Sequence, residues 1–386
     1  MSISNYLRWA CGIFNPINMI IPKNPRRVVF YSNLGFRDNV RAVYDYMVDE
    51  ELYKKYEIVC SCNDYKEYQS NIKNIRFVSP IRGFFYFLTS KYLFYSFGKY
   101  PVVPAPNQTV INLWHGSPLK SIGAYNKNEE QKKQDYFSYV LAASPFFVPV
   151  MANSFHVDSE KVIVCGHGRN DNLFKDCSLL KERFNTESYS KIILWLPTFR
   201  KQSGKTSDSI ENDSETKLAI FDTWSALDEL NDHLKSLNMY CIIKLHPLQE
   251  WSSQTKGEYS NILFFTHQEF AQQKLDLYRV LPLADALITD YSSVYFDYLL
   301  LDRPIAFTIE DISDYADKRG FIFDNPLEYM PGPKIQTKGG FFMFLEACLA
   351  GKDDYREKRK KVNDLCNYYK DGNNCKRILQ KVNMID

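Results

Sequence analysis

DNLFKDCSLLKERFNTESYSKIILWL, residues 171–196, separates two parts of the chain that share one sequence pattern. Residues 171–190 are polar, and the last six residues form an apolar run typical of a buried strand. On both sides of this stretch, apolar runs alternate with amphipathic segments, which is the pattern of βαβ units. The polar part is therefore expected to link two α/β domains, and we place these domains at residues 1–185 and 186–386.

Most of the expected strands are apolar along their whole length, which indicates a parallel sheet covered on both faces. In the first domain we expect strands at residues 27–32, 56–62, 75–78, 93–97, 109–113, 139–142 and 161–165. In the second domain we expect them at residues 191–196, 240–245, 262–265, 286–289 and 304–308. Residues 340–382 look helical and are expected to pack back across the first domain. The prediction is a GT-B-like α/β fold of two facing Rossmann-type domains with a C-terminal helical tail, in which ligands bind beyond the carboxyl ends of the strands, in the cleft between the domains.

Length, charge and cysteine content narrow the class of protein. A chain of 386 residues has room for two domains of about 150–200 residues each. Its formal net charge of +2 does not fit a dedicated nucleic-acid binder, so no nucleic-acid partner is expected. The nine cysteines are odd in number and contain no C-x-x-C pair, which indicates a reducing cytoplasm. The histidines and cysteines do not show metal-ligand spacing, and we assign no metal-binding residue.

The N-terminal residues 1–30 are basic and aromatic and contain no acidic residue. Asn15, Pro16 and Asn18 break the apolar run well short of the ~20 residues that cross a bilayer. Two interpretations stay open: the segment lies on an anionic membrane surface, or it forms a packed helix before the first strand. Residues 82–99 offer the same kind of choice, between an interfacial helix and a buried helix and strand.

Two histidine motifs follow strands of the first domain. WHGSPLK at 114–120 places His115 at a strand end, where an imidazole suits a general base; a hydrogen-bonded turn is the alternative. GHGRND at 166–171 has glycines on both sides of its histidine, which permit close approach of a ligand. In this motif Arg169 offers a fork for phosphate or carboxylate. The alternative is a salt bridge between Arg169 and Asp171.

Three further motifs follow strands of the second domain. In PTFR at 197–200, Arg200 is placed to hold a transferring phosphoryl group, although a surface arginine fits equally well. In KLHP at 244–247, His246 is placed to stabilise charge on phosphate oxygens. TDYSS at 289–293 precedes a helix, whose free N–H groups beside two hydroxyls suit a pyrophosphate; the alternative is capping without a ligand.

Together these motifs resemble the CDP-glycerol glycerophosphotransferase family, the enzymes that prime and polymerise teichoic acids and related capsules. The resemblance covers residues 27–333. Besides the five motifs it includes YSNLGFRDNVRAVYDY (31–46), ITDYSSVYFDYLLLDRPIAF (288–307), DYADKRGFIFD (314–324) and MPGP (330–333). One departure is Gly168, which stands where the family usually has proline. The lack of a long extra N-terminal region favours a primase-like or single-module enzyme.

The resemblance implies a GT-B fold and a displacement in which an acceptor hydroxyl attacks the β-phosphorus of a CDP-polyol and releases CMP. By the motif match His115 is the general base, and His246 and Arg200 stabilise the transferred phosphate. The residues implied in donor binding are Ser292, Ser293, Asp290, Arg319 and Thr198. Further candidate site residues are Arg169, Asp171 and Lys120.

The resemblance also implies the partners. The donor is CDP-glycerol or CDP-ribitol, and the sequence does not choose between them; no tightly bound cofactor is expected, and Mg²⁺ often accompanies pyrophosphate donors. The acceptor is lipid-linked or polymeric, so the enzyme is expected at the inner face of the bacterial membrane as a peripheral protein. Two alternatives remain: a GT-B glycosyltransferase that uses a nucleotide sugar, and a non-catalytic scaffold of capsule assembly. The intact set of His115, His246 and Arg200 argues against the scaffold. The oligomeric state is not predicted.

Overall fold

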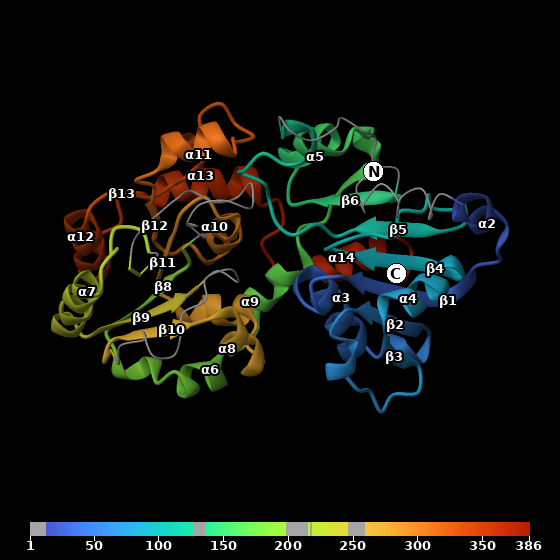
Figure 1. Cartoon of the computed structure of the whole chain (residues 1–386), viewed down its shortest axis with the longest axis horizontal. Helices are drawn as coiled ribbons and strands as arrows, with labels where there is room; N and C mark the ends of the chain where they lie inside the picture. Colours follow the sequence, from blue (N-terminus) through green and yellow to red (C-terminus); the bar gives the residue numbers. More distant parts are fainter. Residues whose placement is uncertain (1–12, 127–135, 198–214, 217, 246–258) are drawn as a thin grey trace. The chain divides into compact units, whose positions relative to one another are not determined.

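The computed structural model describes residues 13–126, 136–197, 215–216, 218–245 and 259–386. The chain divides into two compact units, each built on its own parallel sheet. Unit 1 comprises residues 1–117, 127–172 and 367–386, and unit 2 comprises residues 118–126 and 173–366. Figure 1 shows both sheets with helices on their faces, which confirms the expected α/β architecture. Among the described residues, no helix is both long and apolar enough to cross a membrane.

The sheet of unit 1 has seven parallel strands in the order β3-β2-β1-β4-β5-β6-β7. The order reverses between β1 and β4, the arrangement of a doubly wound Rossmann-type sheet. The strands are β1 (Asn24–Ser32), β2 (Glu57–Cys62), β3 (Ile75–Val78), β4 (Ser90–Tyr95), β5 (Thr109–Asn112), β6 (Tyr139–Ala142) and β7 (Val162–Val164).

One face of this sheet packs against the first long helix and the last helix of the chain. Phe30 of β1 and Phe94 of β4 stack at 5.4 Å and share a core with Val40 of α3 and Ile378 of α14. Of the tail expected at residues 340–382, only the part from residue 367 onwards packs on the first domain, and the helices Lys338–Leu349 and Arg356–Cys366 belong to unit 2. The helices of unit 1 are α2 (Phe14–Ile20), α3 (Asp38–Asp49), α4 (Pro80–Leu88), α5 (Phe147–Phe155) and α14 (Asn374–Lys381).

The sheet of unit 2 has six parallel strands in the order β10-β9-β8-β11-β12-β13, with its reversal between β8 and β11. Trp195 of β8 is fully buried and packs against Phe221 and Phe341. The strands are β8 (Lys191–Trp195), β9 (Met239–Lys244), β10 (Ile262–Phe265), β11 (Ala286–Thr289), β12 (Ile305–Thr308) and β13 (Lys334–Ile335). The helices are α6 (Ser178–Arg183), α7 (Trp224–Ser236), α8 (His267–Gln272), α9 (Leu277–Val280), α10 (Val294–Tyr298), α11 (Ile312–Lys318), α12 (Lys338–Leu349) and α13 (Arg356–Cys366).

The units differ from the expected boundaries of 1–185 and 186–386 in three respects, the first of which is that residues 118–126 belong to unit 2. The main segment of unit 2 begins at Leu173 and not at residue 186, because the link contains α6 and this segment bonds to unit 2: Arg183 donates to the side-chain oxygen of Gln273 at 2.7 Å. The last 20 residues, 367–386, return to unit 1, because Ile378 and Leu379 are fully buried in its core.

Candidate active site

The WHG motif forms a strained turn directly after β5. Trp114 adopts a left-handed conformation with a φ of 53°, and Gly116 has a φ of 121°. Glycine adopts such angles freely, whereas a bulky residue in this region costs about 1–3 kcal/mol and persists only where its surroundings hold it. The side-chain oxygen of Asn112 accepts the N–H of Trp114 at 3.0 Å and so stabilises the turn. Backbone strain of this kind gathers at functional sites.

The imidazole of His115 lies between two aromatic rings. Its ring centroid is 4.0 Å from that of Trp114 and 5.2 Å from that of Phe97, with interplanar angles of 34° and 23°. Burial lowers the pKa of His115 to about 4; Asp38 raises this pKa, while Arg169 and His167 lower it further. The imidazole is therefore neutral at pH 7 and can accept a proton. Within the described part of the chain, its buried Nδ1 has no hydrogen-bond partner.

Arg169 pairs with a residue that motif reasoning did not single out. Its guanidinium lies 2.7 Å from the carboxylate of Asp38, and the two side chains are only 6% and 16% exposed. Its backbone N–H donates to Asn39 Oδ1 at 3.0 Å. The GHGRND loop, the first turn of α3 and the WHG turn are thus brought together in unit 1. The expected alternative, a bond from Arg169 to Asp171, is replaced by the pair with Asp38.

The carboxylate of Asp171 binds the last helix of the chain. One oxygen accepts the N–H of Asn374 and the other that of Cys375, both at 2.8 Å. These are the first residues of α14, where free N–H groups and the helix dipole favour a negative charge. Burial raises the pKa of Asp171, and the two backbone hydrogen bonds oppose that rise. Asp171 therefore fastens α14 to unit 1, and its role towards a ligand stays a prediction.

The donor-site candidates of unit 2 follow β11 at the point where the strand order reverses. Asp290 and Tyr291 are fully buried, and Ser292 and Ser293 are partly exposed beside them. The expected helix is present as α10 followed by a short 3₁₀ turn at Leu299–Leu301. Ser292 Oγ accepts the N–H of Val294 at 3.5 Å, which is long for a hydrogen bond, and the side chain of Ser293 makes no capping bond. The capping interpretation is therefore weakly supported.

Lys120 lies beside an aromatic pair in unit 2 that includes Tyr291. Tyr291 stacks on Tyr315 at 4.3 Å, and Lys120 Nζ lies 5.4 Å above the ring of Tyr315. Residues 119–121 pair antiparallel with residues 320–322: the N–H of Ser121 donates to the carbonyl of Gly320 at 3.1 Å, and the N–H of Ile322 donates to that of Leu119 at 2.9 Å. Three predicted segments, the PLK part of WHGSPLK, TDYSS and DYADKRG, thus meet in unit 2. Arg319 follows α11 within the last of them.

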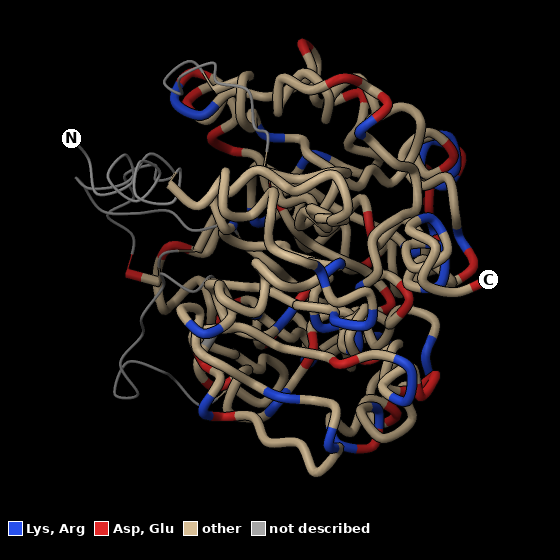
Figure 2. The backbone as a smooth tube through the Cα atoms, turned by 90° about the vertical axis from the view of Figure 1, so that its right-hand side faces the viewer, with Lys and Arg blue, Asp and Glu red and all other residues tan. Residues whose placement is uncertain are grey.

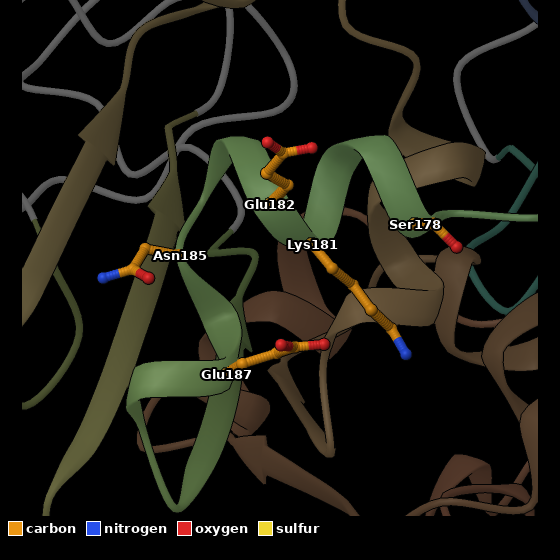
Figure 3. Close-up of a pocket in the computed structure, with 5 residues that line it drawn as sticks. All are labelled: Ser178, Lys181, Glu182, Asn185 and Glu187. Atoms are coloured by element: carbon orange, nitrogen blue, oxygen red, sulfur yellow. The ribbon is translucent and has the colours of Figure 1, made fainter.

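Three predicted site residues, Thr198, Arg200 and His246, lie outside the described residues. The described ranges contain no group of three or more histidine, cysteine or acidic residues that could hold a metal ion. A polar surface pocket lies at α6, and Figure 3 shows that it contains none of the predicted site residues; it is lined by Ser178, Lys181, Glu182, Asn185 and Glu187.

Motif reasoning missed Asp38 and Asn39, although both lie in the segment 31–46 that carries part of the resemblance. The available signal was an Asp-Asn pair at the start of a helix that directly follows the first strand. In a doubly wound sheet this position is at the carboxyl edge, where ligands bind.

Comparison with known proteins identifies the family. A sequence profile of the CDP-glycerol:poly(glycerophosphate) glycerophosphotransferase family matches residues 13–384. The teichoic acid poly(glycerol phosphate) polymerase of Bacillus spizizenii is 26% identical over 348 residues, which cover 82% of each chain. The teichoic acid glycerol-phosphate transferase of Staphylococcus aureus is 28% identical over 300 residues, 72% of each chain. The poly(ribitol-phosphate) polymerase of B. spizizenii is 28% identical, and the match covers 82% of this chain but 50% of that relative.

Solved structures agree on the fold. The wall teichoic acid polymerase TagF superposes with a TM-score of 0.75 at 21% identity, and the match covers 98% of this chain and 92% of the TagF chain. This likeness confirms the predicted GT-B-like architecture. With the profile match over nearly the whole chain, the predicted reaction class is confirmed as well. The chain belongs to the CDP-glycerol:poly(glycerophosphate) glycerophosphotransferase family and is a transferase of polyol phosphate from a CDP-polyol donor.

Proposed function

We propose that this enzyme transfers glycerol phosphate from CDP-glycerol to a hydroxyl of a lipid-linked or polymeric teichoic-type acceptor. A bond forms between the acceptor oxygen and the β-phosphorus of the donor, and the pyrophosphate bond breaks so that CMP leaves with the electron pair. His115 takes the proton of the attacking hydroxyl. The observation that carries this role is the neutral imidazole, held between Trp114 and Phe97 at the strained turn.

The donor is proposed to bind unit 2. Phosphoryl transfer depends mainly on positioning and on neutralising charge. Ser292 and Ser293 offer hydroxyls at the carboxyl end of β11, Asp290 directly follows this strand, and Arg319 and Lys120 supply positive charge. Thr198, Arg200 and His246 are predicted to complete this set from the motifs. Magnesium stays a prediction that rests on the donor, whose pyrophosphate oxygens bind it.

A ligand titration tests the donor assignment. CDP-glycerol at about 100 times its dissociation constant is expected to add roughly 2.7 kcal/mol to the free energy of unfolding, seen as a raised Tm. Ser292→Ala is expected to weaken this shift, whereas the control Ser188→Ala, also in unit 2, leaves it unchanged. CDP-ribitol, CMP, UDP-glucose and UDP-N-acetylglucosamine are titrated in parallel.

Each outcome of the titration has a meaning. A larger shift with CDP-ribitol changes the polyol and keeps the reaction. A shift with a UDP-sugar alone contradicts the proposal and favours the nucleotide-sugar alternative. No shift with any donor favours the scaffold.

The helix α2 supports the proposed membrane location, because its polar side faces the protein. Asn18 is fully buried, and its amide donates to the carbonyl of Val103 at 2.9 Å and to Gln108 Oε1 at 3.0 Å. Lys23, just after the helix, donates to the carbonyl of Leu88 at 2.6 Å. In Figure 2 α2 lies on the side that faces the viewer, and it carries no charged residue. Four apolar side chains at this helix are exposed instead: Ile13, Ile17, Met19 and Ile20.

The neighbouring helix α4 adds to this surface. Phe84 of α4 meets Phe14 of α2 edge to face at 5.1 Å, while Ile81 and Phe85 are 75% and 58% exposed. Residues 82–99 form the end of a helix and a strand, as one alternative expected, but the helix keeps exposed apolar side chains, and the interfacial alternative stays a proposal. Exposed arginines accompany them at Arg26 and Arg82. Exposed apolar side chains flanked by positive charge are suited to an anionic lipid surface.

Vesicle flotation tests the membrane proposal. The protein is expected to float with phosphatidylglycerol vesicles, and the double substitution Ile20→Glu and Phe85→Glu to weaken binding by at least about tenfold, since each apolar side chain buried in lipid contributes roughly 1.5–3 kcal/mol. Leu179→Glu is the control, because Leu179 is equally exposed on α6 of unit 2. Equal binding of the double variant and the wild type would contradict the proposal.

A further inference from the structure

The turn that carries His115 is held by two asparagine side chains. Asn112 Oδ1 accepts the N–H of Trp114 at 3.0 Å. Asn39 Nδ2 donates to the carbonyl oxygens of Leu113 and Trp114 at 3.2 and 3.0 Å. Both backbone polar groups of the left-handed Trp114 are therefore bonded to a side-chain amide. These bonds explain how a bulky residue keeps a conformation that it rarely adopts.

Asn39 uses both of its side-chain N–H groups and its side-chain oxygen in this place. A side-chain amide has two N–H groups and one carbonyl oxygen. Both N–H groups are donated to the WHG turn, and the oxygen accepts the N–H of Arg169 at 3.0 Å. The residue is fully buried, and its partners are 74, 75 and 130 positions away in the sequence. One side chain thus joins the start of α3, the WHG turn and the GHGRND loop.

We propose that Asn39 is a positioning residue of the transfer reaction: its amide keeps Trp114 left-handed and thereby fixes the next residue, His115, whose ring centroid lies 4.0 Å from that of Trp114. The inference rests on the proposed role of His115. Release of the turn would let Trp114 move to an ordinary conformation, and the adjacent imidazole would move with it. A reacting group displaced by about 1 Å can lose about 10²-fold in rate.

The substitution Asn39→Asp separates positioning from packing. Aspartate keeps the shape of the side chain and still accepts the N–H of Arg169. Its second oxygen, however, faces the carbonyl oxygens of Leu113 and Trp114, so that two hydrogen bonds become repulsive contacts. We expect kcat to fall about 10²-fold. The KM for CDP-glycerol is expected to change by less than about twofold, because the donor-site candidates belong to unit 2.

A matched control lies in unit 2. Asn261 is 6% exposed, and its amide donates to the carbonyl of Met239 at 2.8 Å. It precedes β10, at the sheet edge opposite the carboxyl ends of the strands. Asn261→Asp is therefore expected to lower Tm in the same way as Asn39→Asp while kcat stays at the wild-type value.

NMR of protein with isotope-labelled histidine reads the imidazole directly. Six histidines are present, and the His115 signal is identified by its loss in His115→Gln. This signal is expected to move in Asn39→Asp and to stay in Asn261→Asp. If it stays in Asn39→Asp while kcat falls, the positioning role is wrong. If it moves while kcat is unchanged, Asn39 positions the imidazole but the general-base role of His115 is wrong.

A second pair of variants covers the case in which Asn39→Asp does not fold. Asn112→Ala removes the acceptor for the N–H of Trp114, whereas Asn112→Ser keeps an oxygen that can accept it. Serine is expected to restore most of the kcat that alanine loses, and the His115 signal is expected to return towards its wild-type position. Equal rates and equal signals in the two variants would overturn the inference.

Discussion

His115→Gln is expected to lower kcat by about two to four powers of ten, since a positioned general base contributes about 10²–10⁴-fold. Glutamine fills similar space and keeps a polar edge, but it cannot take a proton at neutral pH. CMP release at saturating donor and acceptor gives the rate, and the shift in Tm on adding CDP-glycerol is expected to be unchanged. The control His233→Gln replaces an imidazole that also stacks on an aromatic ring, that of Phe342 at 4.2 Å in unit 2.

The pH dependence of the wild-type rate gives a second test of the role of His115. Because burial lowers the pKa of His115 to about 4, the folded protein keeps this imidazole neutral down to that pH. The wild-type kcat is therefore expected to fall on the acid side only below about pH 5, and not near the ordinary histidine pKa of about 6.5. The unfolded chain binds the proton between these two pKa values, so His115 lowers stability as the pH falls through that window. If His115→Gln retained more than a tenth of the wild-type kcat, His115 would be excluded as the base.

Arg169→Met is expected to lower the free energy of unfolding by about 3–5 kcal/mol, because it leaves the largely buried Asp38 carboxylate without its partner. The urea midpoint measures the change. The control Arg356→Met breaks the ion pair between Arg356 and Asp302, whose side chains are 60% and 39% exposed, respectively. Because such surface pairs contribute about 0–1 kcal/mol, this control is expected to change the free energy of unfolding by no more than that.

A double-mutant cycle isolates the pair. Asp38→Asn combined with Arg169→Met is expected to be more stable than the sum of the two single effects, since neither charge is then left alone. If Arg169→Met cost as little as Arg356→Met, the buried pair would not hold the GHGRND loop to α3.

The sequence predicted the sheets well because their strands are apolar on both faces. The run at residues 27–32 lies within β1 and that at 286–289 matches β11. The two-residue strand β13 was missed, because so short a segment has no recognisable pattern. β4 begins at Ser90, three residues before the expected start, because its first residues are polar in sequence yet pair with β1. Apolar runs in the sequence therefore predicted where the strands lie better than where they begin and end.

Sequence reasoning could propose site residues where they lie directly after strands. His115 and Ser292, which follow β5 and β11, stand out in this way. Asn39 could not be assigned a role, because its partners are far away in the sequence and no local pattern marks them. The same holds for Asp171, whose proximity to Arg169 in sequence suggested a salt bridge although its carboxylate binds α14.

The place of α14 also has a consequence for synthesis on the ribosome. The strands of unit 1 are made first, but the helix that covers Phe30 and Phe94 follows only after residues 173–366. At about 5–20 residues per second, that delay is roughly 10–40 s. During this time one apolar face of the nascent sheet lacks part of its cover, and the Asp171 carboxylate lacks its N–H donors. Unit 1, although its strands are made first, is therefore completed only after α14 has been synthesised.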